Sequence, residues 1–285
     1  MRYCGREFST QEIQWINRQI VEVPGLTRQE LSRRFCEKAH WRKPDGGLKD
    51  MSCRVAFLKM DKAGLIKLPA PTRTYARPGT NMKRTWFCTE QPEIAQPAGR
   101  LNPVLKLVQK GQSALWNEFI DRYHYLGYQA LPGAQLRYFV KSGGKVLALL
   151  GFGAAAWKTA PRDQYIGWDA ETRKSNLHLV VNNARFLILP WVISKNLGSK
   201  ILSMASRRLA SDWENRYNYR PQLLETFVEK KRFVGTCYKA ANWIRVGETK
   251  GRGKLDVKNE YKLPVKSVWL YPLCRDFRKK LCRPL

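Results

Sequence analysis

Apolar residues recur at helical spacing through the N-terminal part of the chain. Two such series begin behind a hydroxyl residue that is followed three positions later by glutamate, at residues 9–12 and 27–30. This spacing is the signature of a capping box, in which the two side chains satisfy free N–H groups of a first helical turn. A third series follows a turn at residues 44–47 and consists of Leu48, Met51, Val55 and Leu58. The pattern predicts three amphipathic helices.

The third predicted helix, residues 48–62, is followed by a turn and a short apolar strand at residues 65–68. This order is typical of a winged helix-turn-helix, whose last helix enters the major groove of DNA. Four residues of this helix are therefore candidates to face DNA: Lys49, Ser52, Arg54 and Lys59. The alternative is a helical protein-interaction module whose basic side chains lie in solvent.

Residues 70–102 lack apolar periodicity and carry recurring prolines and basic residues, among them Arg73 and Arg84. Such a segment favours extended backbone that can follow a row of phosphates. We therefore predict a winged helix-turn-helix domain at residues 1–69, a basic linker at residues 70–102 and an α/β domain at residues 103–285.

The pattern beyond residue 103 alternates between the periods of helix and strand. Two apolar runs joined by Ser142, Gly143 and Gly144 predict a β-hairpin. The predicted order is helix 105–123, strands 136–140 and 146–152, strand 180–189, helix 199–216, strand 223–228 and helix 236–243. This order indicates a mixed α/β (α+β) fold.

The charge balance of the chain indicates which kind of partner it binds. The chain has 52 Lys and Arg against 23 Asp and Glu, a net charge of +29, which repels itself unless an anionic partner shares it. Nucleic acid is the expected partner. The chain has no run of 18 apolar residues and no apolar segment after its N-terminus, so we expect no membrane partner and a cytoplasmic, nucleoid-associated protein. The seven cysteines include no C-x-x-C pair, so no metal site is predicted from them.

Two stretches resemble the GNAT acyltransferase family. Residues 186–190 and 196–202 resemble a strand ending in proline and the loop that holds a cofactor pyrophosphate at a helix N-terminus. Residues 237–247 resemble the family's later helix, and the resemblance places Tyr238 where many of those enzymes have a general acid. Ile193 stands where the family has Gln or Arg, and Asn196 where it has glycine. We therefore name no cofactor, although acyl-CoA is what the family would imply.

A resemblance to the DruA family spans almost the whole chain. It is carried by the opening stretch and by residues 123–128, 162–168, 182–190 and 225–228. That family is known from Druantia anti-phage systems and from mobile elements, sometimes beside transposases, so the resemblance implies a context more than a reaction. A more distant likeness is to the phage Mom protein, a GNAT-like enzyme that modifies adenine in DNA.

Five residues are candidates for chemistry: His124, Tyr125, Asp163, Glu225 and Tyr238. A histidine between tyrosines is suited to proton transfer or to stacking on a base. Glu225 lies in an apolar strand, and a buried carboxylate needs a partner. It could be a general base, a metal ligand together with Asp163, or the ion-pair partner of Arg185.

Further candidates to contact DNA lie in the α/β domain: Asn182, Asn183, Arg185, Lys250, Arg252 and Lys254. An asparagine amide can pair with adenine, and glycines beside Arg252 let backbone approach phosphate. A strand bulge at the two asparagines and a solvated basic loop are the respective alternatives.

Together these patterns favour a protein that binds double-stranded DNA in an anti-phage defence or mobile-element system and modifies a base, using His124, Glu225 and Tyr238 as acid and base groups. Metal-dependent strand cleavage or transposition, with Mg²⁺ held by Glu225 and Asp163, is the second interpretation. The third is a non-catalytic DNA-binding adaptor that recruits a transposase or a helicase.

Overall fold

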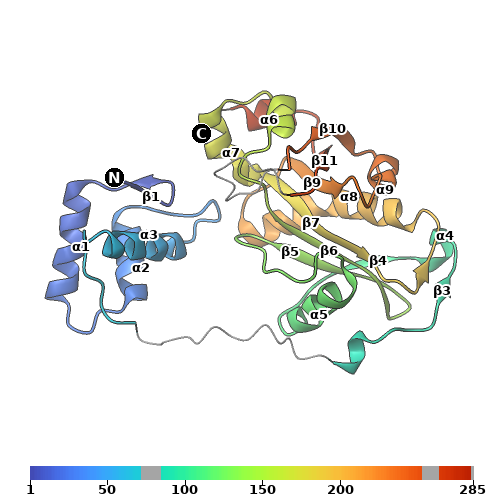
Figure 1. Cartoon of the computed structure of the whole chain (residues 1–285), viewed down its shortest axis with the longest axis horizontal. Coiled ribbons are helices and arrows are strands. Elements are labelled where there is room, and N and C mark those ends of the chain that lie inside the picture. The colour runs from blue at the N-terminus through green and yellow to red at the C-terminus, as the bar shows by residue number, and fades with distance from the viewer. Residues whose placement is uncertain (72–84, 252–262, 284–285) are drawn as a thin grey trace. The chain divides into compact units, whose positions relative to one another are not determined.

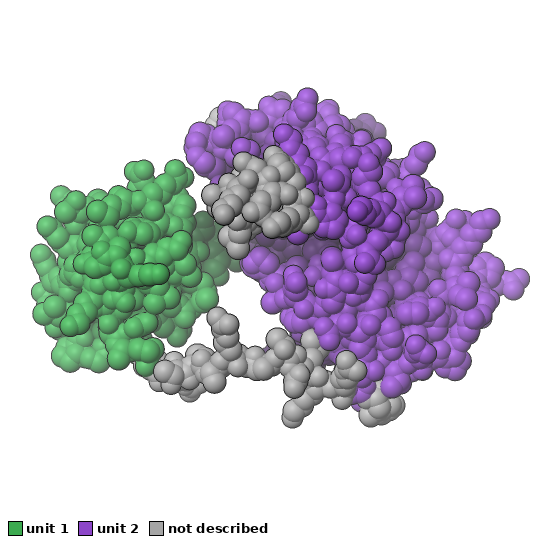
Figure 2. All heavy atoms as spheres, viewed as in Figure 1, with its two compact units in different colours: residues 1–81 green, residues 82–285 purple. Residues whose placement is uncertain are grey.

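A computed structural model describes residues 1–71, 85–251 and 263–283 of the chain. It divides the chain into two compact units, Met1–Asn81 and Met82–Leu285 (Figures 1 and 2). Four of the residues predicted to contact DNA, Arg73, Arg84, Arg252 and Lys254, lie outside the described residues.

Unit 1 contains the three predicted helices, α1 (Thr10–Glu22), α2 (Arg28–Lys38) and α3 (Asp50–Lys62), behind two short paired strands, β1 (Arg2–Tyr3) and β2 (Arg6–Glu7). The capping box of α1 is confirmed, because the Glu12 N–H donates to the Ser9 hydroxyl at 3.1 Å and the Ser9 N–H donates to the Glu12 carboxylate at 3.0 Å. Thr27 caps α2 by accepting from the Glu30 N–H at 3.1 Å, but the Glu30 carboxylate pairs with Arg34 at 2.6 Å, so only half of the second predicted capping box forms.

The strand predicted after the third helix does not form, so the winged helix is not confirmed. Residues 65–68 have no strand partner, and side chains of the helices satisfy their backbone instead. Asn17 donates to the Leu65 carbonyl at 3.1 Å, and Asp61 accepts from the Leu68 N–H at 2.9 Å. In addition, α2 ends at Lys38 and α3 begins at Asp50, a connection longer than the three or four residues of a helix-turn-helix.

The apolar face of α3 is also not the predicted one. Cys53, Ala56, Phe57 and Met60 are buried, whereas Met51, Val55 and Leu58 are exposed. The helix carries two apolar stripes, and the one with the large aromatic ring packs against α2, where Phe57 meets Phe35 with ring centroids 5.5 Å apart. The other stripe therefore lies on the solvent side, beside the exposed Lys59 and the half-buried Ser52.

Unit 2 is built around one sheet of seven strands in the order β10, β11, β9, β7, β6, β5, β4 (Figure 1). The strands are β4 (Val104–Leu107), β5 (Leu136–Ser142), β6 (Lys145–Ala154), β7 (Val180–Ile188), β9 (Leu223–Glu229), β10 (Ile244–Glu248) and β11 (Lys266–Pro272). All neighbours are antiparallel except β7 and β9, which are parallel. The mixed α/β class is thus confirmed, and so is the hairpin of β5 and β6, whose turn glycines have φ of +51° and +80°.

The remaining elements connect these strands. They are η1 (Trp86–Cys88), β3 (Ile94–Ala95), α4 (Ala98–Leu101), α5 (Ser113–Tyr123), α6 (Ala160–Ile166), α7 (Ala170–Asn176), η2 (Leu177–Leu179), β8 (Val192–Ile193), α8 (Leu197–Tyr217), α9 (Thr236–Ala240) and α10 (Phe277–Leu281). Residues 85–101 of the segment predicted as a linker therefore form structure, and Cys88 and Leu101 belong to the core of unit 2.

The predicted helix 105–123 is only half correct. Its first residues form the edge strand β4, in which Leu105 is buried while Val104 and Lys106 are exposed. This alternation has the strand period, and Gly111, with φ of +95°, separates the strand from α5. The predicted helix 236–243 ends early, because Asn242 takes the left-handed conformation with φ of +62°.

Helices cover both faces of the sheet. A Cβ added to Gly151 would lie 3.1 Å from the Trp116 ring of α5 and 3.2 Å from the Arg185 Cβ, so Arg185 faces α5. Phe186 and Ile188 of β7 point to the opposite face, where Gly198 of α8 and Cys237 of α9 pack beside them. None of the described helices is long and apolar enough to cross a membrane.

Candidate functional site at the divergence of two strands

Strands β7 and β9 pair only at residues 180–182 and 223–225, and beyond this point they diverge. On the α9 side of the divergence, the Tyr238 hydroxyl donates to the Asn183 amide oxygen at 2.8 Å. Thr226 donates to the Asn183 carbonyl at 3.0 Å and lies 3.5 Å from the Tyr238 hydroxyl. The Asn183 amide nitrogen donates to the carbonyls of Arg185 and Gly151, at 3.2 and 3.4 Å, where the pairing of β6 and β7 shifts register. Asn183 therefore holds the bulge that the sequence offered as the alternative to a DNA contact.

This network bears on the role that the GNAT resemblance implies for Tyr238. Burial raises the pKa of the Tyr238 hydroxyl well above its usual range. Its proton already lies in a hydrogen bond to Asn183. In this arrangement the Tyr238 hydroxyl fixes the side chain of Asn183, and its role as a general acid stays a prediction.

His124 and Tyr125 immediately follow α5 in the sequence and lie on the α5 side of the sheet. Their rings are stacked, with centroids 4.9 Å apart. Burial and the charge of Arg185 together lower the pKa of His124 to about 4, so the ring is neutral at neutral pH. Its Nδ1 accepts the Leu126 N–H at 3.2 Å, which places the ring proton on Nε2. His124 can therefore donate a hydrogen bond from Nε2, and its second nitrogen is not free to accept a proton from a substrate.

The lowered pKa of His124 predicts a pH dependence of stability. In the unfolded chain the ring takes up a proton near pH 6.5, whereas in the folded chain it resists protonation until about pH 4. The stabilisation is thus complete above pH 6.5 and is lost as pH falls towards 4, by roughly 1–3 kcal/mol. Urea unfolding across this window should show a flatter pH dependence for His124→Gln. Equal slopes for the two proteins would contradict the assignment.

A second cluster, of buried charges, lies where the β6–α6 connection meets β9. Arg162 and Glu225 are both fully buried, and the Arg162 guanidinium donates to the Glu225 carboxylate at 2.8 Å and to Asp163 at 2.8 and 2.9 Å. The other Glu225 oxygen accepts the Ala156 N–H at 2.7 Å. Burial raises the pKa of Glu225, while Arg162 and the Ala156 N–H act in the opposite direction. Trp168 completes the cluster by donating to Asp163 at 3.0 Å.

This geometry corrects the proposed ion pair of Glu225, whose partner is Arg162 and not Arg185. Both oxygens of Glu225 are occupied, and Asp163 is bound by Arg162 and by Arg173 at 3.4 Å. Among the described residues no group of three or more His, Cys, Asp or Glu could hold a metal ion. Glu225 and Asp163 are thus arranged as a structural ion cluster, and a catalytic role for either stays an untested prediction.

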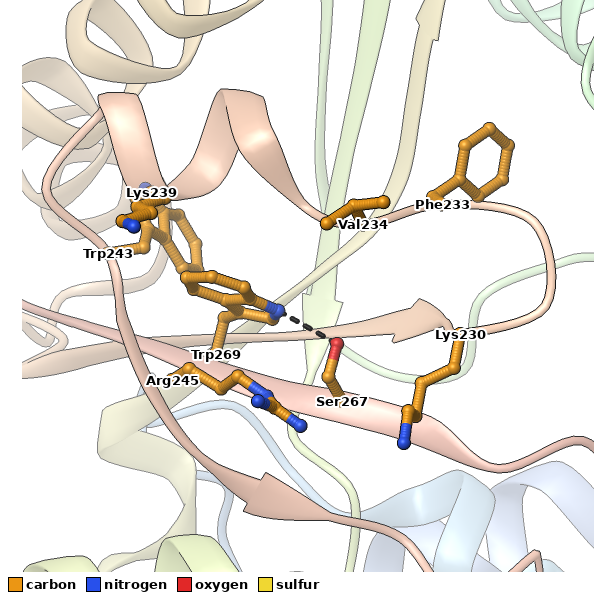
Figure 3. A pocket seen from close by; sticks show the side chains of 8 residues that line it. All are labelled: Lys230, Phe233, Val234, Lys239, Trp243, Arg245, Ser267 and Trp269. Atoms are coloured by element: carbon orange, nitrogen blue, oxygen red, sulfur yellow. Dashed lines mark hydrogen bonds between the residues drawn. The ribbon is translucent and has the colours of Figure 1, made fainter.

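A pocket of about 570 Å³ opens between the 230–234 loop, α9 and the last two strands of the sheet (Figure 3). Trp269 lies in its middle, with its indole N–H donating to Ser267 at 2.9 Å. The other lining residues are Lys230, Phe233, Val234, Lys239, Trp243 and Arg245. The pocket thus combines aromatic rings with three basic side chains, of which Lys230 and Arg245 share the carboxylate of Glu248.

Most of this pocket was not predicted from the sequence. The stretch around Tyr238 was a candidate, but Lys230, Phe233 and Trp269 were not. A tryptophan in the apolar strand at residues 266–272 was the available signal. Nothing local indicates that this strand pairs with residues 223–229, which brings Trp269 to the pocket.

The loop before α8 is where the GNAT resemblance would place a cofactor pyrophosphate, and its residues do not fit acyl-CoA. Asn196 is the left-handed N-terminal cap of α8, with φ of +65° and no side-chain capping bond, and the Ile193 side chain is exposed. The Gly198 Cα is covered, since an added Cβ would lie 3.2 Å from the Cys237 Cβ and 3.9 Å from Phe186. The glycine therefore allows α8 to pack closely on α9, and this loop offers no fitted site for acyl-CoA.

The remaining predicted DNA contacts belong to different elements of the two units. Lys250 is exposed just after β10, and Asn182 pairs with Glu225 across the short parallel ladder, with its amide oxygen buried and without a hydrogen bond in the described structure. In unit 1, Lys49 immediately precedes α3 and Arg54 is paired with Asp50 at 3.2 Å.

The fold and the site define a strongly basic α/β protein whose sheet splits beside an aromatic, cationic pocket. A family model described as Druantia protein DruA matches residues 59–260, more than half of the chain, and the chain belongs to the DruA family. The Druantia protein DruA of Escherichia coli (strain UMEA 4076-1) is 28% identical over 173 residues, which cover 58% of this chain and 39% of that protein. The chain thus spans about two fifths of that relative's length.

Two solved acetyltransferases illustrate the likeness in fold. An aminoglycoside acetyltransferase in complex with coenzyme A is 16% identical, with a TM-score of 0.41, and the match covers 63% of this chain and 98% of that chain. A Drosophila melanogaster polyamine N-acetyltransferase is 11% identical, with a TM-score of 0.39, covering 60% of this chain and 100% of that chain. At these values the likeness carries no conclusion about activity.

Proposed function

We propose that this chain binds double-stranded DNA and modifies a base that it takes out of the duplex, within an anti-phage defence or mobile-element system. The observation that carries the proposal is the pocket of Figure 3, which is lined by Trp269, Trp243 and Phe233 together with three basic side chains. Membership of the DruA family supplies the system.

The chemistry of the pocket suits a nucleotide. Aromatic side chains stack on the flat face of a base, at about 1–3 kcal/mol for each base, and cations bind the adjoining phosphates. A base inside a duplex is out of reach, so an enzyme that acts on it needs such a pocket to receive it. A volume of about 570 Å³ is enough for one nucleotide. The net charge of +29 supports binding to the duplex itself.

The residues that would act on the base lie next to the pocket. Trp243 lines the pocket and its ring lies 5.1 Å from that of Tyr238, which ends the Asn183 network. The Tyr125 ring lies 5.4 Å from that of Phe233, which lines the pocket. The proposal names the base as the acceptor and leaves the donor open, because the loop before α8 does not fit acyl-CoA.

Removal of a base from the stack predicts a preference for weakened base pairs. A duplex with one mismatch should bind about tenfold more tightly than the matched duplex, since a mismatched base costs less to unstack. Phe233→Ala should lose this preference, because Phe233 lines the pocket and is half exposed, so its removal spares the core. Fluorescence anisotropy with both duplexes measures the ratio. Trp157→Ala, an exposed aromatic outside the pocket, should keep it, and an unchanged ratio in Phe233→Ala would contradict the assignment.

A non-catalytic adaptor that recruits a transposase or helicase is the second candidate, and the misfit of the loop before α8 favours it. Mass analysis of nucleosides from DNA incubated with the protein and a cell extract separates the two. Modified nucleosides support the enzyme. If the products stay unmodified while duplex affinity is high and falls steeply between about 50 and 200 mM salt, the adaptor is supported.

A further inference from the structure

Arg185 is a buried cation for which the described residues provide no counter-ion. Its side chain faces α5 and is 8% exposed. Its only hydrogen bond among the described residues runs from Nη1 to the Ala184 carbonyl, at 2.8 Å, and Nε has no partner. No carboxylate of the described structure pairs with it, and Glu225, the partner expected from the sequence, is held by Arg162. A buried charge without a partner is costly, so an anion from outside the chain is expected.

His124 and Tyr125 lie near Arg185, and both can donate hydrogen bonds. His124 is close enough for the charge of Arg185 to lower its pKa, and its proton lies on Nε2 because Nδ1 accepts the Leu126 N–H. Tyr125 stacks on His124 and is 38% exposed, so the cluster reaches the surface. The nearby Arg232 lies over the Tyr125 ring at 5.1 Å and pairs with Glu229 at 3.2 Å, so within the described part of the chain this carboxylate balances Arg232 and not Arg185.

We propose that Arg185 and His124 form an anion site that binds a phosphate group on the α5 side of the sheet. A guanidinium presents a planar fork that matches two phosphate oxygens, and a neutral imidazole N–H adds a third donor. The site is separate from the pocket of Figure 3 but adjoins the same 230–234 loop, through the contact of Tyr125 with Phe233.

The phosphate could belong to a DNA strand or to a free phosphorylated co-substrate. Its assignment to DNA rests on the proposed function, because a strand whose base enters the pocket would carry neighbouring phosphates past the 230–234 loop. The anion site itself rests only on the unpaired charge, so it can hold even if the chain does not modify DNA.

The test uses the full chain, inorganic phosphate and thermal unfolding. Wild type should unfold about 3–5 °C higher at phosphate concentrations about ten times its Kd. Arg185→Met should lose this shift and, without anions, should unfold at the same temperature as wild type or higher, since it removes an unpaired buried charge. Calorimetric titration with phosphate should show binding to wild type and none to Arg185→Met.

Two control variants make the result specific. Arg162→Met removes a buried arginine that is fully paired, so it should lower the unfolding temperature without anions. Arg232→Met removes an exposed arginine and should keep the phosphate shift. The proposal is overturned if Arg185→Met keeps the shift, if wild type shows none, or if Arg185→Met unfolds as readily as Arg162→Met.

Two further ligands identify the source of the phosphate. A single-stranded oligonucleotide that needs Arg185 for tight binding, with at least a tenfold loss in Arg185→Met and none in Arg232→Met, assigns the site to DNA. A nucleoside diphosphate that competes with inorganic phosphate while the oligonucleotide does not assigns it to a free co-substrate. If neither ligand competes with inorganic phosphate, the proposed nucleotide ligand is wrong.

Discussion

Glu225→Ala should lower the free energy of unfolding by about 3–5 kcal/mol. The substitution leaves the Arg162 guanidinium fully buried with one of its two carboxylate partners missing, and a broken buried ion pair costs more than the intact pair contributes. It also removes the acceptor of the Ala156 N–H. Urea unfolding followed by circular dichroism measures the change.

The control is Glu171→Ala, which breaks the exposed pair with Lys174 and should cost less than about 1 kcal/mol. The double variant Glu225→Leu with Arg162→Met should recover much of the loss, since apolar residues of similar volume can replace a buried pair. If Glu225→Ala kept full stability and duplex affinity but lost an activity on DNA, Glu225 would be catalytic and the structural interpretation would be wrong.

Local patterns predicted the elements whose determinants lie within a few residues. The Ser9 and Thr27 caps, the glycines of the β5–β6 turn and the helix predicted at residues 199–216, observed as α8, are all confirmed. Each depends on contacts made within one turn of helix or one hairpin, so the sequence pattern contains them.

Contacts between distant segments were predicted less well. Glu225 was correctly expected to be buried, and an ion pair was one of the three roles left open for it. Its partner, Arg162, lies 63 positions away, and no local pattern distinguishes it from Arg185. The prediction of the buried face of α3 was wrong for a similar reason. Both stripes of the helix are apolar, and only the packing of Phe57 on Phe35 decides which of them is buried. Tertiary context selects among such local alternatives.

The two buried arginines, Arg162 and Arg185, differ in whether the fold supplies partners for their charge. Arg162 is bound by two carboxylates and a carbonyl, so its charge is balanced within the fold. Arg185 has one carbonyl and no carboxylate among the described residues. Burial alone does not identify a binding group, whereas burial without a hydrogen-bonding or charged partner does. The sequence does not reveal the partners of the two arginines, so it could not distinguish between them.

Gly235→Ala should lower the free energy of unfolding by about 3 kcal/mol and abolish the preference for mismatched duplexes. Gly235 has φ of +82°, a conformation that costs an L-residue about 1–2 kcal/mol. An added Cβ would lie 2.8 Å from Cζ2 of Trp269, so the indole in the middle of the pocket must move, at a further cost of about 1–3 kcal/mol. Urea unfolding and the anisotropy ratio of matched and mismatched duplexes measure the two effects.

Gly167→Ala separates backbone strain from the clash with Trp269. Gly167 has a similar φ of +87°, but an added Cβ would meet nothing within 4 Å. It should therefore cost only the backbone term of about 1–2 kcal/mol and leave the mismatch preference intact. Equal losses of stability in the two variants would mean that Trp269 moves freely. Loss of the mismatch preference in Gly167→Ala as well would mean that the preference does not come from the pocket, because that substitution leaves Trp269 in place.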